Sequence, residues 1–277
     1  HKLAFSHFVI GNINKSYTIY KESLIKSEEL GDEFAIGASK RGLSMIYSSR
    51  GEKEKTREYL ESATKIFKNI DDKYLLSVCL HDFGLFYQHN AEYDKSINYF
   101  KQCINLRNQV GKAIDVSIMA MAESYYLMGE IDKSLDYFEE ALQSFNNNNN
   151  KMRIAVTCIH ISEIYLHRTD YNNALKYSSL AEKIQTELGG SPQAYLWTYV
   201  YYFISQKYLG VEFNKTKLYK LIEENKIWSK SNKISWYDND FILPYRLYKL
   251  LEDISYLDTS RRVIHKKANN LEPDVAA

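Results

Sequence analysis

The chain has 277 residues, with 36 basic and 35 acidic side chains and a formal net charge of +1. This balance excludes a strongly basic nucleic-acid-binding protein and a chain dominated by an acidic tail. Three cysteines, Cys79, Cys103 and Cys158, are too few and too widely spaced for a disulfide scaffold or a zinc site built on cysteine pairs. The longest apolar run is about half the length that a membrane-spanning helix needs, and no secretory signal occurs, so we expect a cytoplasmic protein.

Glycine and proline are scarce. There are eleven glycines and three prolines, and the first 191 residues contain no proline. Proline disrupts helix interiors and is common in the loops of β-rich folds, so its absence favours long helices joined by short connections. The 24 tyrosines and 12 phenylalanines supply large packing surfaces. The composition therefore predicts an all-α fold.

The expected helices alternate between a first and a second helix of successive pairs. Residues 1–10 are interpreted as the tail of an earlier first helix. The second helices are expected at 12–30, 52–69, 92–110, 130–146, 170–188, 214–230 and 254–270. The first helices are expected at 33–50, 73–90, 112–128, 151–168, 193–209 and 234–251. Turn residues such as Gly31-Asp32 and Asp71-Asp72 lie between consecutive pairs.

An internal repeat supports this division. The tyrosines Tyr47, Tyr87, Tyr125 and Tyr165 recur at intervals of 40, 38 and 40 residues, and each is followed four residues later by a turn position. Those turn positions hold Gly51, Ala91, Gly129 and Thr169. Each following helix carries small, bulky and small residues at spacings of four and three, although Ser178 stands where the fourth repeat should have its bulky residue. These spacings mark one helix face, on which small residues let a neighbouring helix approach closely.

The stretch Met121–Leu142, MAESYYLMGEIDKSLDYFEEAL, resembles a tetratricopeptide repeat. That family places a small residue and then a tyrosine late in its first helix, a Gly-Asp-Tyr-like turn, and an Ala/Phe/Ala pattern in its second helix. The matching positions in two successive repeats are Gly84, Tyr87, Tyr93, Ser96, Phe100, Cys103, Ala122, Tyr125, Gly129, Ser134, Phe138 and Ala141. The resemblance extends over residues 11–188 and weakens afterwards.

The resemblance implies a right-handed α-solenoid of about seven antiparallel helix pairs with a concave inner wall. The repeat length of 38–40 residues is similar to the long-helix branch of the family found in signalling regulators and scaffolds. We expect a regular array over 1–190, with its first pair truncated, and degenerate pairs with a C-terminal cap over 191–277, continuous with the array. The aromatic segment 195–203 is interpreted as part of this cap, with a docking surface as the alternative.

Catalytic and metal-binding motifs are absent from the sequence, including Gly-rich phosphate loops, nucleophile elbows and His-Glu-x-x-His. The nearest candidate is the set His160, Glu163 and His167, whose spacings place three metal-ligating side chains on one helix face. An interpretation of these residues as polar groups of the inner wall is favoured over a metal site. We expect no enzymatic activity, no metal and no cofactor.

The resemblance also implies which residues face the concave groove. These candidates are Arg41, Met45, His81, Asp82, Gln88, Met119, Glu123, Tyr126, His160, Glu163 and His167. Chaperone-binding members clamp a terminal carboxylate with a lysine and an asparagine four residues later. The corresponding places here hold Arg41 and Met45, His81 and Leu85, Met119 and Glu123, and Ile159 and Glu163, which argues against a chaperone C-terminus as the ligand.

The expected wall is apolar with scattered Arg, His and Glu side chains, which suits an extended peptide or an amphipathic helix. We therefore expect a non-catalytic scaffold that binds a protein or peptide in its groove. The alternative is a regulatory sensor arm of a larger signalling enzyme or peptide-responsive regulator, with an adjacent domain of the full-length protein as a further partner. The lysine-rich stretch Lys215–Lys233 is interpreted as a solvated outer face, because a nearly neutral chain disfavours nucleic acid, and no membrane partner is expected.

Overall fold

The structure is a computed structural model that describes residues 1–189, 192–231 and 242–268. Over these residues the regular secondary structure consists of fourteen α-helices and contains no strand. The chain forms two compact units, an N-terminal unit of His1–Ser134 and a C-terminal unit of Leu135–Ala277. The all-α architecture of paired helices predicted from the sequence is confirmed.

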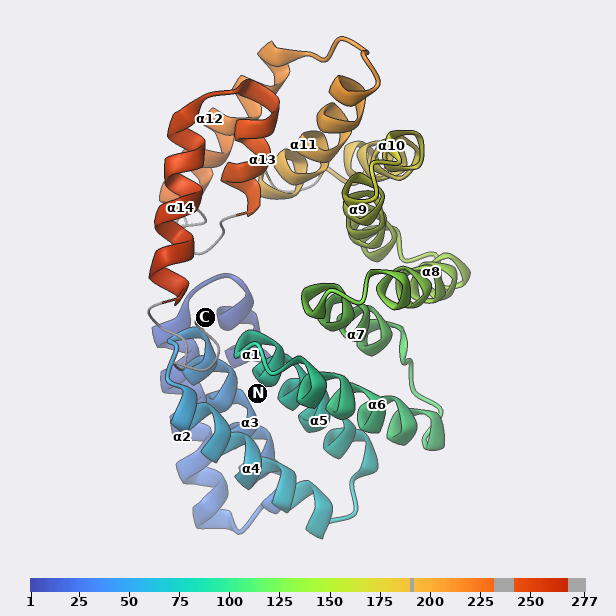
Figure 1. Cartoon of the computed structure of the whole chain (residues 1–277). Helices are drawn as coiled ribbons and strands as arrows, with labels where there is room; N and C mark the ends of the chain where they lie inside the picture. The colour runs from blue at the N-terminus through green and yellow to red at the C-terminus, as the bar shows by residue number, and fades with distance from the viewer. Residues whose placement is uncertain (190–191, 232–241, 269–277) are drawn as a thin grey trace. The chain divides into compact units, whose positions relative to one another are not determined.

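The N-terminal unit consists of seven helices joined by short turns, so that sequence neighbours run in opposite directions and pack against each other (Figure 1). They are α1 (Lys2–Val9), α2 (Ile13–Leu30), α3 (Glu33–Ser49), α4 (Lys53–Asn69), α5 (Lys73–His89), α6 (Tyr93–Gln109) and α7 (Asp115–Met128). The pairs α3 with α4 and α5 with α6 correspond to two successive sequence repeats.

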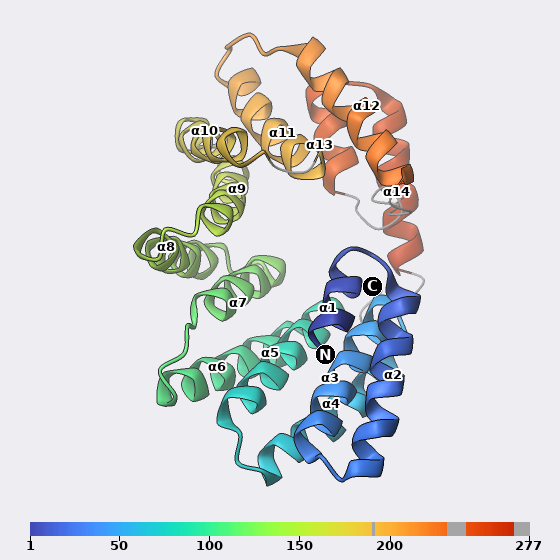
Figure 2. The ribbon, with the colours of Figure 1, turned by 180° about the vertical axis from the view of Figure 1, so that it is seen from behind.

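The C-terminal unit continues the pairing of neighbouring helices, and its helix Pro192–Tyr208 then packs against two later helices. Its helices are α8 (Ile131–Asn147), whose first turn belongs to the N-terminal unit, α9 (Lys151–His167), α10 (Tyr171–Leu188), α11 (Pro192–Tyr208), α12 (Lys215–Ser231), α13 (Ile242–Leu251) and α14 (Ile254–Ala268). Figure 2 shows α11 beside both α12 and α13. Within the described residues, the predicted helix boundaries agree with these to within three residues. The predicted positions 234–241, 269 and 270 lie outside the described residues.

Helix starts and ends follow from local chemistry. Asp72 and Asp170 cap α5 and α10 by accepting hydrogen bonds from the backbone N–H groups of Leu75 and Asn173, at 2.8 and 3.1 Å. The four predicted turn positions all adopt a left-handed backbone, and two of them hold Ala91 (φ 60°) and Thr169 (φ 58°) rather than glycine. That conformation costs a non-glycine residue about 1–2 kcal/mol, so the surrounding helix packing must impose it.

The small–bulky–small pattern packs paired helices at close range. Ser96, Phe100 and Cys103 of α6 are fully buried against α5. A Cβ atom added at Gly84 of α5 would overlap the ring of Phe100. The interpretation of the small residues as points of close helix approach is therefore confirmed here.

The aromatic segment of α11 forms a hydrophobic core in the C-terminal unit. Tyr199, Tyr201 and Phe203 are buried in one cluster with Leu218 of α12 and Leu247 of α13. These rings supply the packing that small and bulky residues supply in the regular repeats. The division of the sequence near residue 190 into regular and degenerate repeats stays a prediction.

Candidate functional site

Two predicted groove residues of the N-terminal unit form an ion pair between successive first helices. The Nε of Arg41 on α3 lies 2.6 Å from Oδ2 of Asp82 on α5, and a second guanidinium nitrogen lies 3.4 Å from Oδ1. Burial lowers the pKa of the Arg41 guanidinium, but its interactions with Asp82 outweigh that effect, so the pKa lies above its ordinary value. The two side chains remain 27% and 15% exposed. The repeat therefore places these charges together on one accessible face.

A pocket of about 330 Å³ opens beside this ion pair. It is formed by α1, α3, α4 and α5 and is lined by Phe8, Ser44, Met45, Ser48, Ser49, Thr56, Leu60, Asp82, Leu85, Phe86 and His89. Met45 and Asp82 are predicted groove residues, and Ser48 and Leu85 occupy inward positions on the same two helices. We call this the N-terminal pocket.

Several residues of the N-terminal pocket are not apparent from the repeat pattern. Phe8 comes from α1, which precedes the regular repeats, and Phe86 and His89 lie outside the inward positions of α5. Leu60 occupies the repeated bulky position of α4. The repeat pattern predicts that Leu60 packs between helices, but nothing in the pattern predicts that it borders a pocket.

The hydroxyl groups at this pocket bond to their own helices. Ser44 Oγ donates to the carbonyl of Arg41 at 2.7 Å, and Thr56 Oγ1 donates to the carbonyl of Glu52 at 2.8 Å. Ser49 Oγ donates to the carbonyl of Ile46 at 2.7 Å. Because each hydroxyl has a single hydrogen, these three groups keep only lone pairs for any further partner.

Other predicted groove residues of the N-terminal unit have contacts between helices. Nδ1 of His81 lies 3.0 Å from Ser117 Oγ, and its ring lies 5.3 Å from that of Phe100. Gln88 is buried, and its amide donates to the carbonyl of Ala120 and to Ser124 Oγ. Gln88 thus joins α5 to α7 and presents little surface to a ligand.

The three candidates on α7 differ in exposure. Met119 is buried, whereas Glu123 and Tyr126 are partly buried. Met119 therefore contributes to packing, and the surface that α7 offers a ligand comes from the other two side chains.

The predicted groove residues of the C-terminal unit are engaged differently. The ring of His160 stacks on Phe138, with centroids 5.0 Å apart and planes 7° apart. Glu163 is buried and pairs with Arg246 of α13, with Oε1 3.3 Å from a guanidinium nitrogen. His167 is exposed in the last turn of α9, where a basic side chain interacts favourably with the helix dipole. Within the described part of the chain, no three His, Cys, Asp or Glu side chains form a group able to hold a metal ion.

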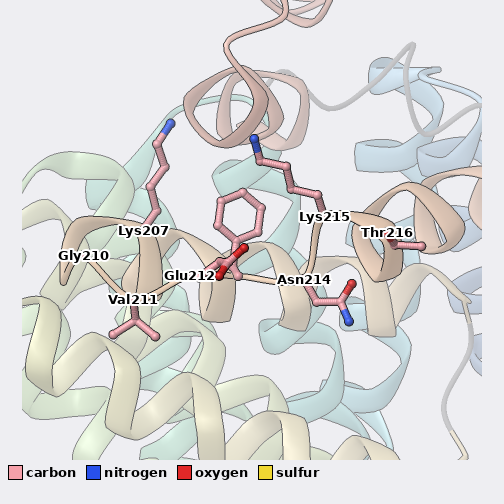
Figure 3. Close-up of a pocket in the computed structure, with 8 residues that line it drawn as sticks. Lys207, Gly210, Val211, Glu212, Asn214, Lys215 and Thr216 are labelled. Atoms are coloured by element: carbon pink, nitrogen blue, oxygen red, sulfur yellow. The ribbon is translucent and has the colours of Figure 1, made fainter.

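A second hollow, of about 860 Å³, surrounds the turn between α11 and α12 (Figure 3). Lys207 at its edge donates to the carbonyls of Lys249 and Leu250 at 2.9 and 3.2 Å, and to Glu252 at 2.8 Å. The hydrogen bond from Lys207 lowers the pKa of the Glu252 carboxyl. Lys207 therefore secures the C-terminal end of α13.

The three cysteines are buried, and their thiols have raised pKa values. Burial raises the pKa of the Cys79 and Cys158 thiols to about 12 and also raises that of Cys103. A neutral thiol is a poor nucleophile, so none of the three fits a catalytic role. Among the described helices, none combines the length and apolar character needed to cross a bilayer.

Comparison with known proteins places this geometry in context. Among curated proteins, the chain is 23% identical over 130 residues to the 43 kDa receptor-associated protein of the synapse from Gallus gallus. That match covers 45% of this chain and spans only 30% of the relative.

Solved structures share the fold over nearly the whole chain. A Rap protein complexed with Competence and Sporulation Factor superposes with a TM-score of 0.74 and 15% identity, covering 96% of this chain and 73% of that one. NprR in complex with its cognate peptide NprX superposes with a TM-score of 0.62 and 17% identity, covering 97% of this chain and 79% of that one.

The family model of the tetratricopeptide repeat matches residues 79–110 and 117–148. These matched stretches run from α5 into α6 and from α7 into α8, over the two repeats in which the sequence pattern is clearest. The resemblance inferred from the sequence is thereby confirmed over these two repeats, and the chain shares its helical fold with the Rap and NprR structures.

Proposed function

We propose that this chain is a non-catalytic interaction module that binds a peptide, or an extended segment of a protein, at the N-terminal pocket. The observation that carries the proposal is the pocket itself. Residues from two successive first helices, among them Met45, Asp82 and Leu85, converge on one accessible cavity. A mostly apolar cavity with a few polar groups is the usual form of a ligand site.

The relatives support a peptide as the ligand. Two structures with the same fold hold Competence and Sporulation Factor in one case and a cognate peptide in the other. The neutral, buried thiols are consistent with a module that binds rather than catalyses. Free thiols such as Cys79 also fit a reducing compartment, which supports a cytoplasmic location.

A second candidate function is a regulatory sensor arm of a larger protein. It is supported by the partial coverage of the curated relative, since this chain matches only 30% of that protein. In that case the pocket binds the regulating peptide, or a segment of an adjacent domain, and the binding module is coupled to the rest of the protein.

Selection from a displayed peptide library tests the proposal even though the natural ligand is unidentified. Ser48 is exposed and lines the pocket, so Ser48→Trp should block the cavity while leaving the fold intact. Asn98 is exposed on α6 outside the pocket, so Asn98→Trp is the matched control. We expect selected peptides to bind Ser48→Trp at least about tenfold more weakly than the parent, a loss of about 1.4 kcal/mol. They should bind Asn98→Trp as tightly as they bind the parent.

If the library yields no binder, or if Ser48→Trp binds every selected peptide as well as the parent does, the N-terminal pocket is not the site. Circular dichroism of both variants establishes that a loss of affinity does not come from unfolding.

A further inference from the structure

The least exposed polar residues of the N-terminal pocket offer acceptors, whereas the exposed Ser48 and His89 can also donate. The hydroxyls of Ser44 and Thr56 each donate their single hydrogen to a backbone carbonyl of their own helix. Both hydroxyls can therefore only accept a hydrogen bond from a ligand. The Asp82 carboxylate has about four lone-pair positions, of which Arg41 occupies two. Ser44, Thr56 and Asp82 are also the least exposed polar residues of the lining. A ligand group that reaches them must therefore bring a hydrogen-bond donor.

The charge around the pocket is already balanced. When His89 is neutral, Asp82 is the one charged residue of the lining. Arg41 balances this charge, with its Nε 2.6 Å from Oδ2 of Asp82. A ligand cation at Asp82 would lie close to the Arg41 guanidinium and be repelled by it. A ligand anion would have no donor among Ser44, Thr56 and Asp82. The balance favours an uncharged donor.

The remaining walls favour a flat ring. Phe8, Met45, Leu60, Leu85 and Phe86 supply the apolar lining. Phenylalanine rings stack or meet edge to face with an aromatic ligand, and a methionine sulfur adapts to ring edges. The volume, about 330 Å³, lies at the lower end of the range of roughly 300–1,000 Å³ for ligand pockets, which suits one side chain rather than a whole peptide.

From these three features we infer that the N-terminal pocket is an anchor subsite for an uncharged aromatic side chain that ends in an N–H donor, of which the indole of tryptophan is the natural example. Indole nitrogen donates and does not accept, which complements the acceptors of Ser44, Thr56 and Asp82. The inference rests on the proposed function, because it assigns the part of the peptide that enters the cavity.

Small probes test this subsite directly. The matched set is indole, 1-methylindole, which keeps the ring but lacks the donor, and tryptamine, which adds a cation. Methyl NMR of methionine-labelled protein reports binding, because Met45 lines the pocket and Met152, 66% exposed on α9, serves as an internal control. Met45→Leu assigns the signal.

We expect indole to shift the Met45 methyl signal in a saturable way and to leave that of Met152 in place. 1-Methylindole should bind about three- to tenfold more weakly, the usual effect of one buried hydrogen bond. Tryptamine should bind no more tightly than indole, and Ser48→Trp should abolish the Met45 shift by filling the cavity with its own ring.

Equal binding of indole and 1-methylindole would overturn the inference, as would tighter binding of tryptamine or no shift with any probe. The failure of the proposed function looks different. Indole that binds at Met45 while the library yields no peptide contradicts the peptide proposal, whereas selected peptides anchored by aliphatic or basic residues contradict the aromatic subsite alone.

Discussion

Two ion pairs, one in each unit, show that predicted inward positions of the first helices can have different surroundings. In the N-terminal unit, Arg41 and Asp82 pair between successive first helices and border an open pocket. In the C-terminal unit, Glu163 on α9 pairs with Arg246, which comes from α13, 83 residues further along the chain. The first pair is 27% and 15% exposed and the second 18% and 10%. A predicted inward position thus borders an open pocket in one unit and pairs with the chain's own α13 in the other.

A second contrast concerns how paired helices approach. In the N-terminal unit, Gly84 has no side chain, and the Phe100 ring therefore lies against the backbone of α5. At the equivalent places of the fourth repeat stand Ser162 and Ser178, and both hydroxyls donate to the carbonyl of Ala174, at 2.9 and 2.7 Å. The first of these hydrogen bonds joins α9 to α10, whereas the second lies within α10. At this place in the fourth repeat a hydrogen bond between the helices stands where the second repeat has a buried ring.

The largest effect should come from breaking the more buried ion pair. Arg246→Met leaves the Glu163 carboxylate buried without its partner and removes the guanidinium that lies 5.7 Å from the Tyr201 ring. We expect a loss of about 2–4 kcal/mol in the free energy of unfolding, measured in urea. The double variant Arg246→Met/Glu163→Leu should recover most of this loss, because a buried pair is often replaceable by apolar groups. A loss below about 1 kcal/mol would mean that the pair is solvated and does not cover α9.

The next largest effect should come from filling the close approach in the N-terminal unit. Gly84→Ser forces a side chain against Phe100 and should cost about 1–3 kcal/mol, the usual penalty for overpacking. The control is Ser162→Ala in the C-terminal unit, which removes one hydroxyl and should cost about 1 kcal/mol. If thermal unfolding shows Gly84→Ser to be the milder change, the two helices are not held at the distance that the structure shows.

Removing the partly exposed arginine should change specificity more than stability. Arg41→Met leaves Asp82 beside the pocket with its charge no longer neutralised. We expect a loss of about 1 kcal/mol in stability, because Asp82 retains some access to water. The preference of the pocket should reverse, with tryptamine binding several-fold more tightly than indole in the methyl NMR titration. An unchanged preference would show that Asp82 does not set the charge of the ligand.

A loss of stability that both units share should appear only at high pH. The folded state holds the pKa of the Cys79 and Cys158 thiols at about 12, whereas an unfolded thiol ionises near about 8.5. Above that pH the unfolded state releases protons that the folded state keeps, so stability is full below about pH 8.5 and falls as pH rises towards 12. The variant Cys79→Ala/Cys158→Ala should show a shallower fall in Tm between pH 8 and 10.5. Curves of the same slope would mean that the thiols are not the groups involved.

The sequence repeat predicts most of the fold and part of the candidate site. Tyrosines at a spacing near 40 residues define the register, and with it the helix boundaries and the turns at Ala91 and Thr169. The same register places Met45 and Asp82 on one face, where the structure puts them together at the pocket.

Contacts that cross several repeats lie beyond such a pattern. Nothing in the spacing relates Arg246 to Glu163, because the signature is lost after residue 190 and the contact depends on how α13 packs on α11. Phe8 enters the pocket from a short helix that precedes the regular repeats. Sequence periodicity therefore predicts which face a residue occupies, while long-range packing decides whether that face stays open.

The central claim is that the inner face binds its ligand in the N-terminal unit and not at α9. The most direct test is photo-crosslinking of a library-selected peptide that carries a benzophenone at its anchor position, followed by mass spectrometry of the linked residues. We predict crosslinks to pocket residues of α3 and α5, such as Met45 and Leu85, that disappear in Ser48→Trp. Crosslinks confined to α9 or α13 would contradict this account.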